Sequence, residues 1–338
     1  MLRRIALLTL IAAGLISCSD EGSSSDEGTA GDDGKSGDIR ASEVWKDGVK
    51  LTGVVRIYEG ATVEIEPGAK IDCTEAAQIQ VGGTLRVKAT AEHATISCPR
   101  WRGIVVAQNG QLDIDGLDLE NAEYAIETTK GAGAVNVTDS SLLAAVHPFT
   151  VGPESKLSLT RVKATASTRL LEGESSVSEV RGVLVAKYLE YNSNTNEGIM
   201  LKEGGEADIE DSVLEGKAED LVSSYGGKSL KLRYSTLRGA HCGPHLQAIG
   251  TTEIDHITSE GNLFAITIYG ASVEGPHVIK DSNFIGVTAW LDLQGDHGPL
   301  AFENVYVEGS EVILNTAPPA TLTKAPARIE GAGPRPPK

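Results

Sequence analysis

The sequence predicts an all-β fold in which about eleven short coils of chain stack on one another as a parallel β-solenoid. Two similar octapeptides reveal the repeat: IEDSVLEG at 209–216 and IKDSNFIG at 279–286. Equivalent positions recur every 21 to 29 residues along most of the chain, and the charges beside them alternate in sign from one repeat to the next. A unit of this size cannot bury its own apolar face, so neighbouring units must stack.

Each repeat is predicted to contain three short strands and three turns. An apolar residue, which we call the anchor, is usually preceded by an aliphatic residue two positions earlier, as expected for a strand with one buried side. A second apolar or small residue stands five positions after the anchor, and a turn-forming residue seven positions after it. The predicted anchors are Ile65, Val87, Ile114, Val137, Leu159, Val180, Ile209, Leu232, Ile254, Ile279 and Phe302.

Two further columns of residues follow from the anchors. The residue two positions after the anchor is predicted to lie in a turn, where Asp and Asn can bond their own backbone. This turn column includes Asp139, Asp211, Tyr234, His256, Asp281 and Asn304. The residues five positions after the anchors are Leu119, Leu142, Ala164, Val185, Leu214, Leu237, Phe284 and Val307.

Charged residues flank the anchors on the side predicted to face solvent. Stacking in register places each charge about 4.8 Å from the equivalent residue of the next coil, which has the opposite sign. Each exposed pair is worth about 0.2 to 1 kcal/mol, so these ladders are predicted to fix the register more than to stabilise the fold. The flanking residues are Glu64 and Glu66, Arg86 and Lys88, Asp113 and Asp115, and later Asp208 and Glu210, Lys231 and Arg233, Glu253 and Asp255.

Residues 1–17 are predicted to be a secretory signal peptide. They combine two arginines with an apolar stretch, and the stretch from Ile5 to Ile16 is too short to cross a bilayer as a helix. The sequence LISC at 15–18 resembles the lipobox of bacterial lipoproteins, which implies that Cys18 becomes the lipid-modified first residue of the mature chain. The expected partner is therefore a membrane, reached through acyl chains.

The lipobox resemblance also implies a place in the bacterial cell envelope. Ser19, rather than an aspartate, follows Cys18, and in the sorting rule of bacterial lipoproteins this favours the outer membrane. Residues 18–40 are rich in Asp, Glu, Gly and Ser, so they are predicted to form a flexible tether. The net charge of −17 argues against nucleic acid as a partner.

Residues 41–315 are predicted to form the solenoid, with an N-terminal cap over the first coil in which Trp45 acts as a plug. Cys73 and Cys98 lie 25 residues apart at one phase of the repeat. In an exported protein this predicts a disulfide between adjacent coils, and two buried thiols are the alternative. Residues 316–338 hold six of the thirteen prolines and are predicted either to block the last strand edge or to hang free.

Three sequences near the start of the predicted solenoid resemble a known family. GATVEIEPGAKI, GTLRV and ISCPRWRGIVV look like the first coils of the bacterial right-handed parallel β-helix proteins of the pectin-lyase-like superfamily. The resemblance covers residues 41–315 and implies a right-handed winding of the coils. That superfamily includes polysaccharide lyases and hydrolases with active sites on an outer face, but the quoted motifs indicate the fold and no particular activity.

A carbohydrate-active enzyme acting on anionic polysaccharide is the alternative function that this resemblance implies. In such lyases acids bind Ca²⁺ and a nearby Arg or Lys accepts the proton, and Asp208, Lys231, Arg233 and Asp255 supply those residue types. The charge ladder explains the same residues, so no catalytic residue and no cofactor are predicted outside that alternative. GDHG at 295–298 matches the Gly-His-Gly stretch of the hydrolases only in part and is interpreted as a glycine-rich turn.

Two further clusters are candidate ligand sites. His241, Cys242 and His245 offer three metal-binding side chains within five residues, although a Gly-Pro turn around a buried cysteine is the simpler interpretation. A polar stretch at 187–196 combines two tyrosines with amides, which suit contact with sugars or proteins. Its candidate contact residues are Tyr188, Tyr191, Asn192 and Asn194.

The leading hypothesis is a membrane-anchored, exported lipoprotein whose β-helix serves as a binding, adhesion or display module. It would act on envelope polysaccharide or on another envelope protein, without catalysis. Aromatic residues make up only 4% of the chain, which argues against an extended aromatic platform for sugars.

Overall fold

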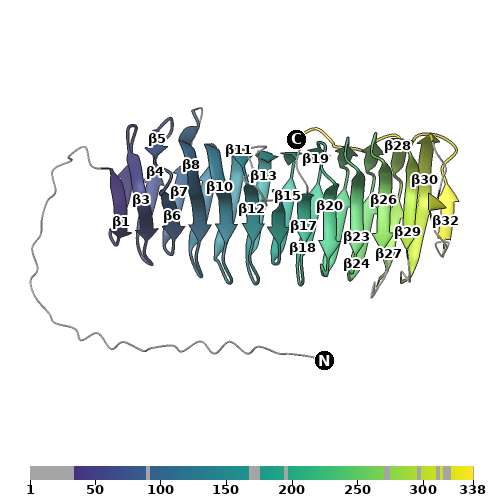
Figure 1. The fold of residues 1–338 in the computed structure, drawn as a ribbon, viewed down its shortest axis with the longest axis horizontal. Coiled ribbons are helices and arrows are strands. Elements are labelled where there is room, and N and C mark those ends of the chain that lie inside the picture. Colours follow the sequence, from purple (N-terminus) through teal and green to yellow (C-terminus); the bar gives the residue numbers. More distant parts are fainter. Residues whose placement is uncertain are drawn as a thin grey trace, which may run out of the picture. The chain divides into compact units, whose positions relative to one another are not determined.

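The computed structural model describes residues 34–88, 92–166, 176–193, 197–269, 275–294, 298–309, 313–314 and 321–337, which belong to one compact unit. Among these residues every regular element is a strand, and the strands stack as a parallel β-solenoid of about eleven turns. Figure 1 shows the strands following one another along one long axis, from β1 to β32. The all-β solenoid that the repeat predicts is therefore confirmed.

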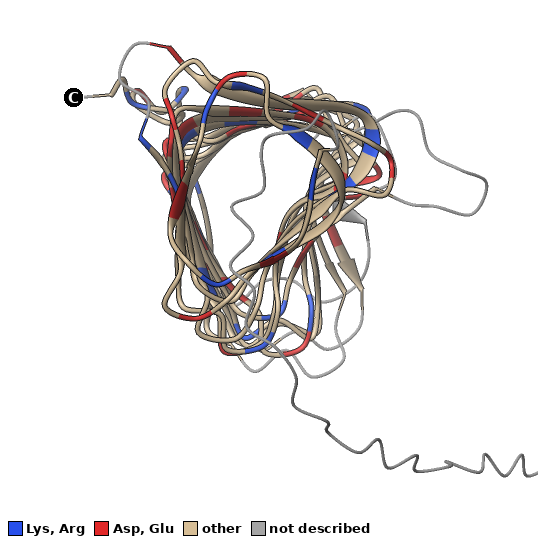
Figure 2. Cartoon of the chain, turned by 90° about the vertical axis from the view of Figure 1, so that its left-hand side faces the viewer, with Lys and Arg blue, Asp and Glu red and all other residues tan. Residues whose placement is uncertain are grey.

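Each turn contributes one strand to each of three faces, which surround the core in the axial view of Figure 2. Face 1 carries the anchors. Its strands are β2 (Glu43–Trp45), β4 (Thr62–Ile65), β7 (Thr84–Lys88), β9 (Gln111–Asp115), β11 (Ala134–Ala145), β13 (Lys156–Ala166), β15 (Val183–Lys187), β18 (Glu206–Glu210), β21 (Ser229–Arg233), β24 (Thr251–Asp255), β27 (His277–Lys280) and β30 (Leu300–Gly309).

The longest strands bend round a corner, so their second halves belong to the next face. Face 2 contains the second halves of β11, β13 and β30, together with β5 (Lys70–Cys73), β8 (Ala94–Val106), β10 (Leu117–Thr128), β16 (Glu190–Asn192), β19 (Val213–Glu215), β22 (Thr236–Arg238), β25 (Thr258–Glu260) and β28 (Asn283–Val287).

Face 3 begins nearest the N-terminus of the described chain. It contains the second halves of β8, β10 and β3 (Lys50–Ile57), whose first residues pair with β5 on face 2. The other strands of face 3 are β1 (Lys35–Ile39), β6 (Gln78–Val81), β12 (His147–Val151), β14 (Ser178–Val180), β17 (Glu197–Leu201), β20 (Asp220–Tyr225), β23 (Cys242–Gln247), β26 (Phe264–Tyr269), β29 (Ala289–Gln294) and β31 (Ile313–Leu314). The last strand, β32 (Thr321–Lys324), pairs with β30.

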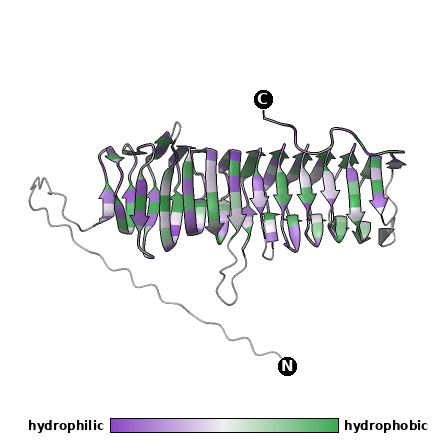
Figure 3. Ribbon diagram, turned by 90° about the horizontal axis from the view of Figure 1, so that it is seen from above, coloured by the Kyte–Doolittle hydropathy of each residue, from purple (hydrophilic) through white to green (hydrophobic). Residues whose placement is uncertain are grey.

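The predicted anchors form a continuous buried column on face 1. Val87 pairs with Ile65 on one side and Ile114 on the other, and Ile254 pairs with Leu232 and Ile279 in the same way. Apart from Val180, every predicted anchor lies in this column and is at most 1% exposed. Figure 3 shows the resulting alternation of apolar and polar residues along the strands.

One anchor was assigned wrongly. Leu159 pairs with Ala186, which in turn pairs with Ile209, so Ala186 and not Val180 occupies the column. Val180 lies on face 3, between Val151 and Leu201. A buried alanine satisfies this position as well as a larger apolar residue does, because neighbouring coils supply the bulk.

The same shift corrects the column five positions after the anchors. Tyr191, and not Val185, stands between Ala164 and Leu214 on face 2. Its ring is fully buried, and it packs edge-on against Phe149 with ring centroids 5.9 Å apart.

The predicted turn column is present, and its backbone is left-handed. Every residue that follows an anchor by two positions from Asp139 to Asn304 has a φ angle between 45° and 56°. Asp and Asn tolerate this region, and the Ser that follows several of them completes the corner. Ser212, for example, donates to the carbonyl of Glu210 at 2.8 Å and accepts a hydrogen bond from the amide of Leu189 in the preceding coil at 3.0 Å.

The ends of the described chain are also strand-paired. β1 pairs with β3, although it lies within residues 18–40, which were predicted to be a tether. Trp45 is fully buried beside the first coils, and Cys73 and Cys98 are joined by a disulfide with Cα atoms 5.1 Å apart. At the other end, β32 covers the last long strand, and the chain beyond it turns back along the solenoid.

Candidate functional site

A groove runs along face 2, across the strands from β13 to β28. It consists of two adjoining hollows of about 500 and 650 Å³ that share Asn192, Glu215 and Arg238. The smaller hollow reaches back to Lys163 and the larger one forward to Gly286. Because Asn192, Glu215 and Arg238 occupy equivalent positions of successive coils, the groove follows the axis of the solenoid.

Glycines at one corner of face 2 keep the larger hollow free of side chains. Gly216, Gly239, Gly261 and Gly286 line it and have φ angles of 135°, 84°, 63° and 62°. A Cβ atom at Gly216 would lie 1.8 Å from the carbonyl oxygen of Ser193, a contact that only a backbone movement relieves. Glycine is therefore required at Gly216, and the absence of side chains at the four positions leaves the hollow open.

Charged and amide side chains form a ladder along the groove. The guanidinium of Arg238 lies 2.6 Å from Glu215 on one side and 3.8 Å from Glu260 on the other. The amide of Asn192 donates to Glu215 at 3.3 Å. The hydrogen bond that Arg238 donates to Glu215 raises the pKa of Arg238, so the groove carries a fixed positive charge between two carboxylates.

The four residues predicted to form a binding loop lie in different surroundings. Asn192 lines both hollows of the groove, and Tyr188 lies in the turn column. Tyr191 is wrong as a contact residue, because its ring is buried and its hydroxyl lies 3.0 Å from Ser178 and 3.3 Å from the carbonyl of Gly198. Asn194 lies outside the described residues.

The C-terminal segment 325–337 lies along the same side of the molecule. Figure 1 shows it running back from β32 towards β19. Asn283 forms two hydrogen bonds with the backbone of Ile329, at 2.9 and 3.0 Å. Further back, Thr258 donates to the carbonyl of Ala332 at 3.2 Å. The segment thus runs across successive coils of the stack.

Arg335 fixes the far end of this segment. Its guanidinium donates to both carboxylate oxygens of Asp211, at 2.6 and 2.8 Å, contacts Glu210, and stacks 3.7 Å above the ring of Tyr234. Burial alone would raise the pKa of Asp211, but the hydrogen bonds and charge of Arg335 outweigh it and hold that pKa below its usual value. Arg335 therefore covers two residues of the turn column, Asp211 and Tyr234.

A third hollow, of about 390 Å³, lies directly beyond this segment. Pro337 forms one wall, and His93, Arg161 and Tyr188 form others. Arg161 makes a two-pronged pair with Asp139, with both distances 2.5 Å. The hollow continues the line that the segment follows.

The residues considered for a lyase form the predicted ladder on face 1. Asp208 stands opposite Lys231, and Arg233 opposite Asp255. Arg233 donates to Asp208 at 2.7 Å and lies 3.9 Å from Glu210. Asp208 and Arg233 are thus held in an ion pair, and Asp255 lies 3.5 Å from Lys280, in agreement with the predicted ladder. Asp296 and His297 of the GDHG sequence lie outside the described residues.

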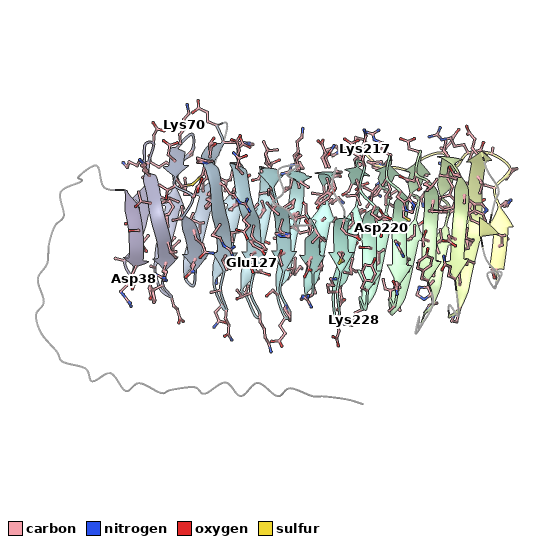
Figure 4. The ribbon with its side chains drawn as sticks, in the orientation of Figure 1. Asp38, Lys70, Glu127, Lys217, Asp220 and Lys228 are labelled. Carbon is pink, nitrogen blue, oxygen red and sulfur yellow. A yellow bond between two sulfur atoms is a disulfide. The ribbon has the colours of Figure 1, made fainter. Side chains whose placement is uncertain are left out.

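A compact polar group lies on face 3, where β17, β20 and β23 meet the preceding corner. Two consecutive residues turn inward at that corner, Leu221 and Val222 in β20, so that Asp220 and Ser223 face the same outer side. Asp220 pairs in register with Cys242, and Ser223 with His245. Figure 4 labels Asp220 on this face.

The structure brings two of the three predicted metal-binding residues together and replaces the third. Ligand atoms of Asp220, Cys242 and His245 lie within 4.8 Å of one another. His241 lies outside this group: its half-exposed ring places Nδ1 3.3 Å from the sulfur of Cys242 and 3.6 Å from Glu219. Asp220 was missed because it belongs to the preceding coil, and only the register of the repeat could have identified it.

The polar group is buried and rich in acids. Burial raises the pKa of the Cys242 thiol, and the charges of Asp220 and Glu219 raise it further. Burial, then the charge of Asp220, raises the pKa of Glu197 to about 7. Glu197 accepts a hydrogen bond from Ser223 at 2.9 Å, and Asp220 and His245 are linked at 2.8 Å.

Comparisons with known proteins add no family to these observations. No protein-family model, no curated protein and no solved structure matches this chain. Within the part of the chain that the structure describes, no helix is long and apolar enough to cross a membrane.

Proposed function

We propose that this protein is an exported lipoprotein, anchored in the bacterial cell envelope through Cys18, whose rigid solenoid binds an extended polymer in the groove of face 2. The observation that carries the proposal is the groove, which runs along the axis over equivalent positions of successive coils. With coils about 4.8 Å apart, the path from β13 to β28 is about 24 Å long. That length fits a segment of an extended chain better than a compact small molecule.

The lining of the groove favours a polymer with hydroxyl or amide groups. Glu215 and Glu260 offer acceptors, Arg238 offers donors, and Asn192 offers both. Among the lining residues the only aromatic one is Tyr191, whose ring is buried, so binding would depend on hydrogen bonds and not on stacking. An envelope polysaccharide meets this description, and an extended segment of an envelope protein is the second polymer of the same shape.

Binding is tested by retention of the protein on immobilised cell-wall polysaccharide. We expect Arg238→Glu and Lys217→Glu to weaken retention by at least about tenfold, because they place negative charge beside Glu215 and Glu260. Arg102→Glu is the matched control, since Arg102 pairs with Glu123 at 2.5 Å outside the groove. Equal retention of all three variants and the unaltered chain would remove the groove from consideration.

The anchor is tested separately from the groove. Cys18→Ser is expected to move the protein from the membrane fraction to the soluble fraction, because the acyl chains provide the attachment. Outer-membrane location is expected in a fractionation of inner and outer membranes. Unchanged membrane association of the Cys18→Ser chain would contradict the lipid anchor without affecting the proposal for the groove.

A second function, cleavage of an anionic polysaccharide, is favoured by one observation on face 3. Glu197 has a pKa raised to about 7 beside a second carboxylate, Asp220, as expected of a general acid. Release of reducing ends or of unsaturated product from uronic-acid polymers, abolished by Glu197→Gln, would replace the binding proposal by this one. Retention without product would leave binding as the function.

A further inference from the structure

Two adjacent strands of face 3 bring three metal-binding side chains together. Asp220 in β20 lies directly opposite Cys242 in β23, and His245 follows Cys242 by three residues on the same outer side. In both strands two consecutive residues point into the core, Leu221 and Val222 in β20 and Gly243 and Pro244 in β23. The residues on either side of each pair therefore lie on the same outer side, and the register of the coils places them next to one another. The three side chains thus converge because of the repeat, although Asp220 is 22 residues from Cys242 in the sequence.

The distances are those of a metal site before its ligands close on the ion. The nitrogen and oxygen of His245 and Asp220 are 2.8 Å apart, and all three ligand atoms lie within 4.8 Å of one another. In a zinc site with bonds of about 2.0 to 2.3 Å, ligand atoms lie about 3 to 4 Å apart.

A buried atom without a partner points to a ligand at this place. Asp220 is only 1% exposed, yet its Oδ1 has no hydrogen-bond partner. Buried carboxylate oxygens are normally satisfied by donors or by a cation. Nearby acids add to the negative potential: Glu197 lies opposite Asp220 in register, and Glu219 precedes it.

We propose that Asp220, Cys242 and His245 bind a divalent cation of the zinc type. A thiolate, an imidazole and a carboxylate together select zinc over the oxygen-preferring calcium and magnesium. Binding exchanges the thiol proton of Cys242 for the cation: the sulfur–metal bond forms and one proton leaves to solvent. Three protein ligands leave one coordination position, for which the imidazole of His241, 3.3 Å from the sulfur, or a water is the nearest candidate.

A second acidic group serves as an internal contrast. Asp255, His256 and Asp281 also place ligand atoms close together, but none of the three is buried. Their atoms already have partners: His256 and Lys280 lie 2.6 and 3.5 Å from Asp255, and Asn304 donates to Asp281 at 2.7 Å. We therefore expect no tight cation site there.

The site is tested by titrating the chelator-treated full chain with Co²⁺, a spectroscopic substitute for zinc. We expect a thiolate-to-cobalt charge-transfer band that saturates at about one cation per chain. Cys242→Ser is expected to abolish the band, and Asp220→Asn and His245→Gln to weaken affinity by at least about 100-fold. His256→Gln and Cys18→Ser are the controls and should leave the band and the affinity unchanged.

A measurement on the unaltered chain keeps the proposal testable even where a variant fails to fold. Calorimetric titration with Zn²⁺ in two buffers of different ionisation enthalpy reports the protons released on binding. We expect about one proton per cation, that of the Cys242 thiol. Absence of a charge-transfer band, a band that persists in Cys242→Ser, or Zn²⁺ binding without proton release would each overturn the proposal.

Discussion

At the scale of single residues, the serine that follows the turn column acts as a link between coils. Its hydroxyl donates to a carbonyl of its own coil and accepts from an amide of the preceding one, at Ser140, Ser212 and Ser282 alike. Each hydroxyl therefore satisfies a backbone amide that the strand ladder leaves unpaired at the corner. This explains why the repeat places Ser directly after Asp.

We predict that Ser212→Ala lowers the free energy of unfolding by about 1 to 3 kcal/mol, because it leaves the buried amide of Leu189 without an acceptor. Urea unfolding followed by circular dichroism measures the change. Ser229→Ala is the matched control: that hydroxyl is half-buried and makes a long bond of 3.4 Å to Glu206, so its loss should cost less than about 0.5 kcal/mol. Equal losses in the two variants would show that the corner bond is not stabilising.

At the scale of elements, the disulfide joins the strands of two adjacent coils near the N-terminal end. Cys73 is the last residue of β5 and Cys98 lies in β8, 25 residues further along the chain. A loop of this length restricts the unfolded chain enough to contribute about 3 kcal/mol. Because each coil of a solenoid contacts only its neighbours, the benefit should be local to the first coils.

We predict that Cys73→Ser combined with Cys98→Ser increases hydrogen exchange in β4 to β9 while β20 to β24 exchange as before. A reducing agent should reproduce this effect in the unaltered chain and have no further effect in the double variant. Uniform loss of protection along the whole solenoid would contradict a local role for the bond.

The elements also show how far sequence reasoning reaches. Periodicity identified the solenoid, the column of anchors and the charge ladder, because these depend on a residue type recurring at a fixed position. Periodicity fails where a coil is long: between Leu159 and Ile209 it predicts Val180 as the anchor, whereas Ala186 occupies the column, and it predicts a surface position for Tyr191, whose ring is buried. Asp220 was missed for a different reason, since its role depends on a neighbour in the next coil and not on its own surroundings in the sequence.

At the scale of the whole molecule, segment 325–337 changes how the solenoid holds together. Contacts within the stack join neighbouring coils, whereas this segment connects Val305 in the last long strand with Asp211, four coils back. Unfolding of the C-terminal coils therefore requires release of Arg335 from Asp211. The segment adds long-range cooperativity to an architecture that otherwise has little.

The pH dependence of this contact follows from the lowered pKa of Asp211. A carboxyl whose pKa is lower in the folded state contributes stability above its ordinary pKa of about 3.9, and that contribution is lost as the pH falls through the folded-state value. The connection between Arg335 and the solenoid should thus persist at neutral pH and weaken only in strong acid. Asp211→Asn removes the titrating group, so stability in that variant should lack this acid-induced loss.

We predict that Arg335→Ala lowers the protection of β23 to β29 against hydrogen exchange at neutral pH, by about 1 to 2 kcal/mol, while β4 to β9 are unaffected. The reason is that the buried carboxylate of Asp211 loses its two-pronged partner and keeps the backbone amide of residue 335, at 3.2 Å, and Lys187, 3.6 Å away. Arg328→Ala, in the same segment but exposed, is the control and should change nothing. If both variants exchange like the unaltered chain, the segment is merely in contact with the solenoid and does not couple its coils, whereas a loss confined to Arg335→Ala places the coupling at Asp211.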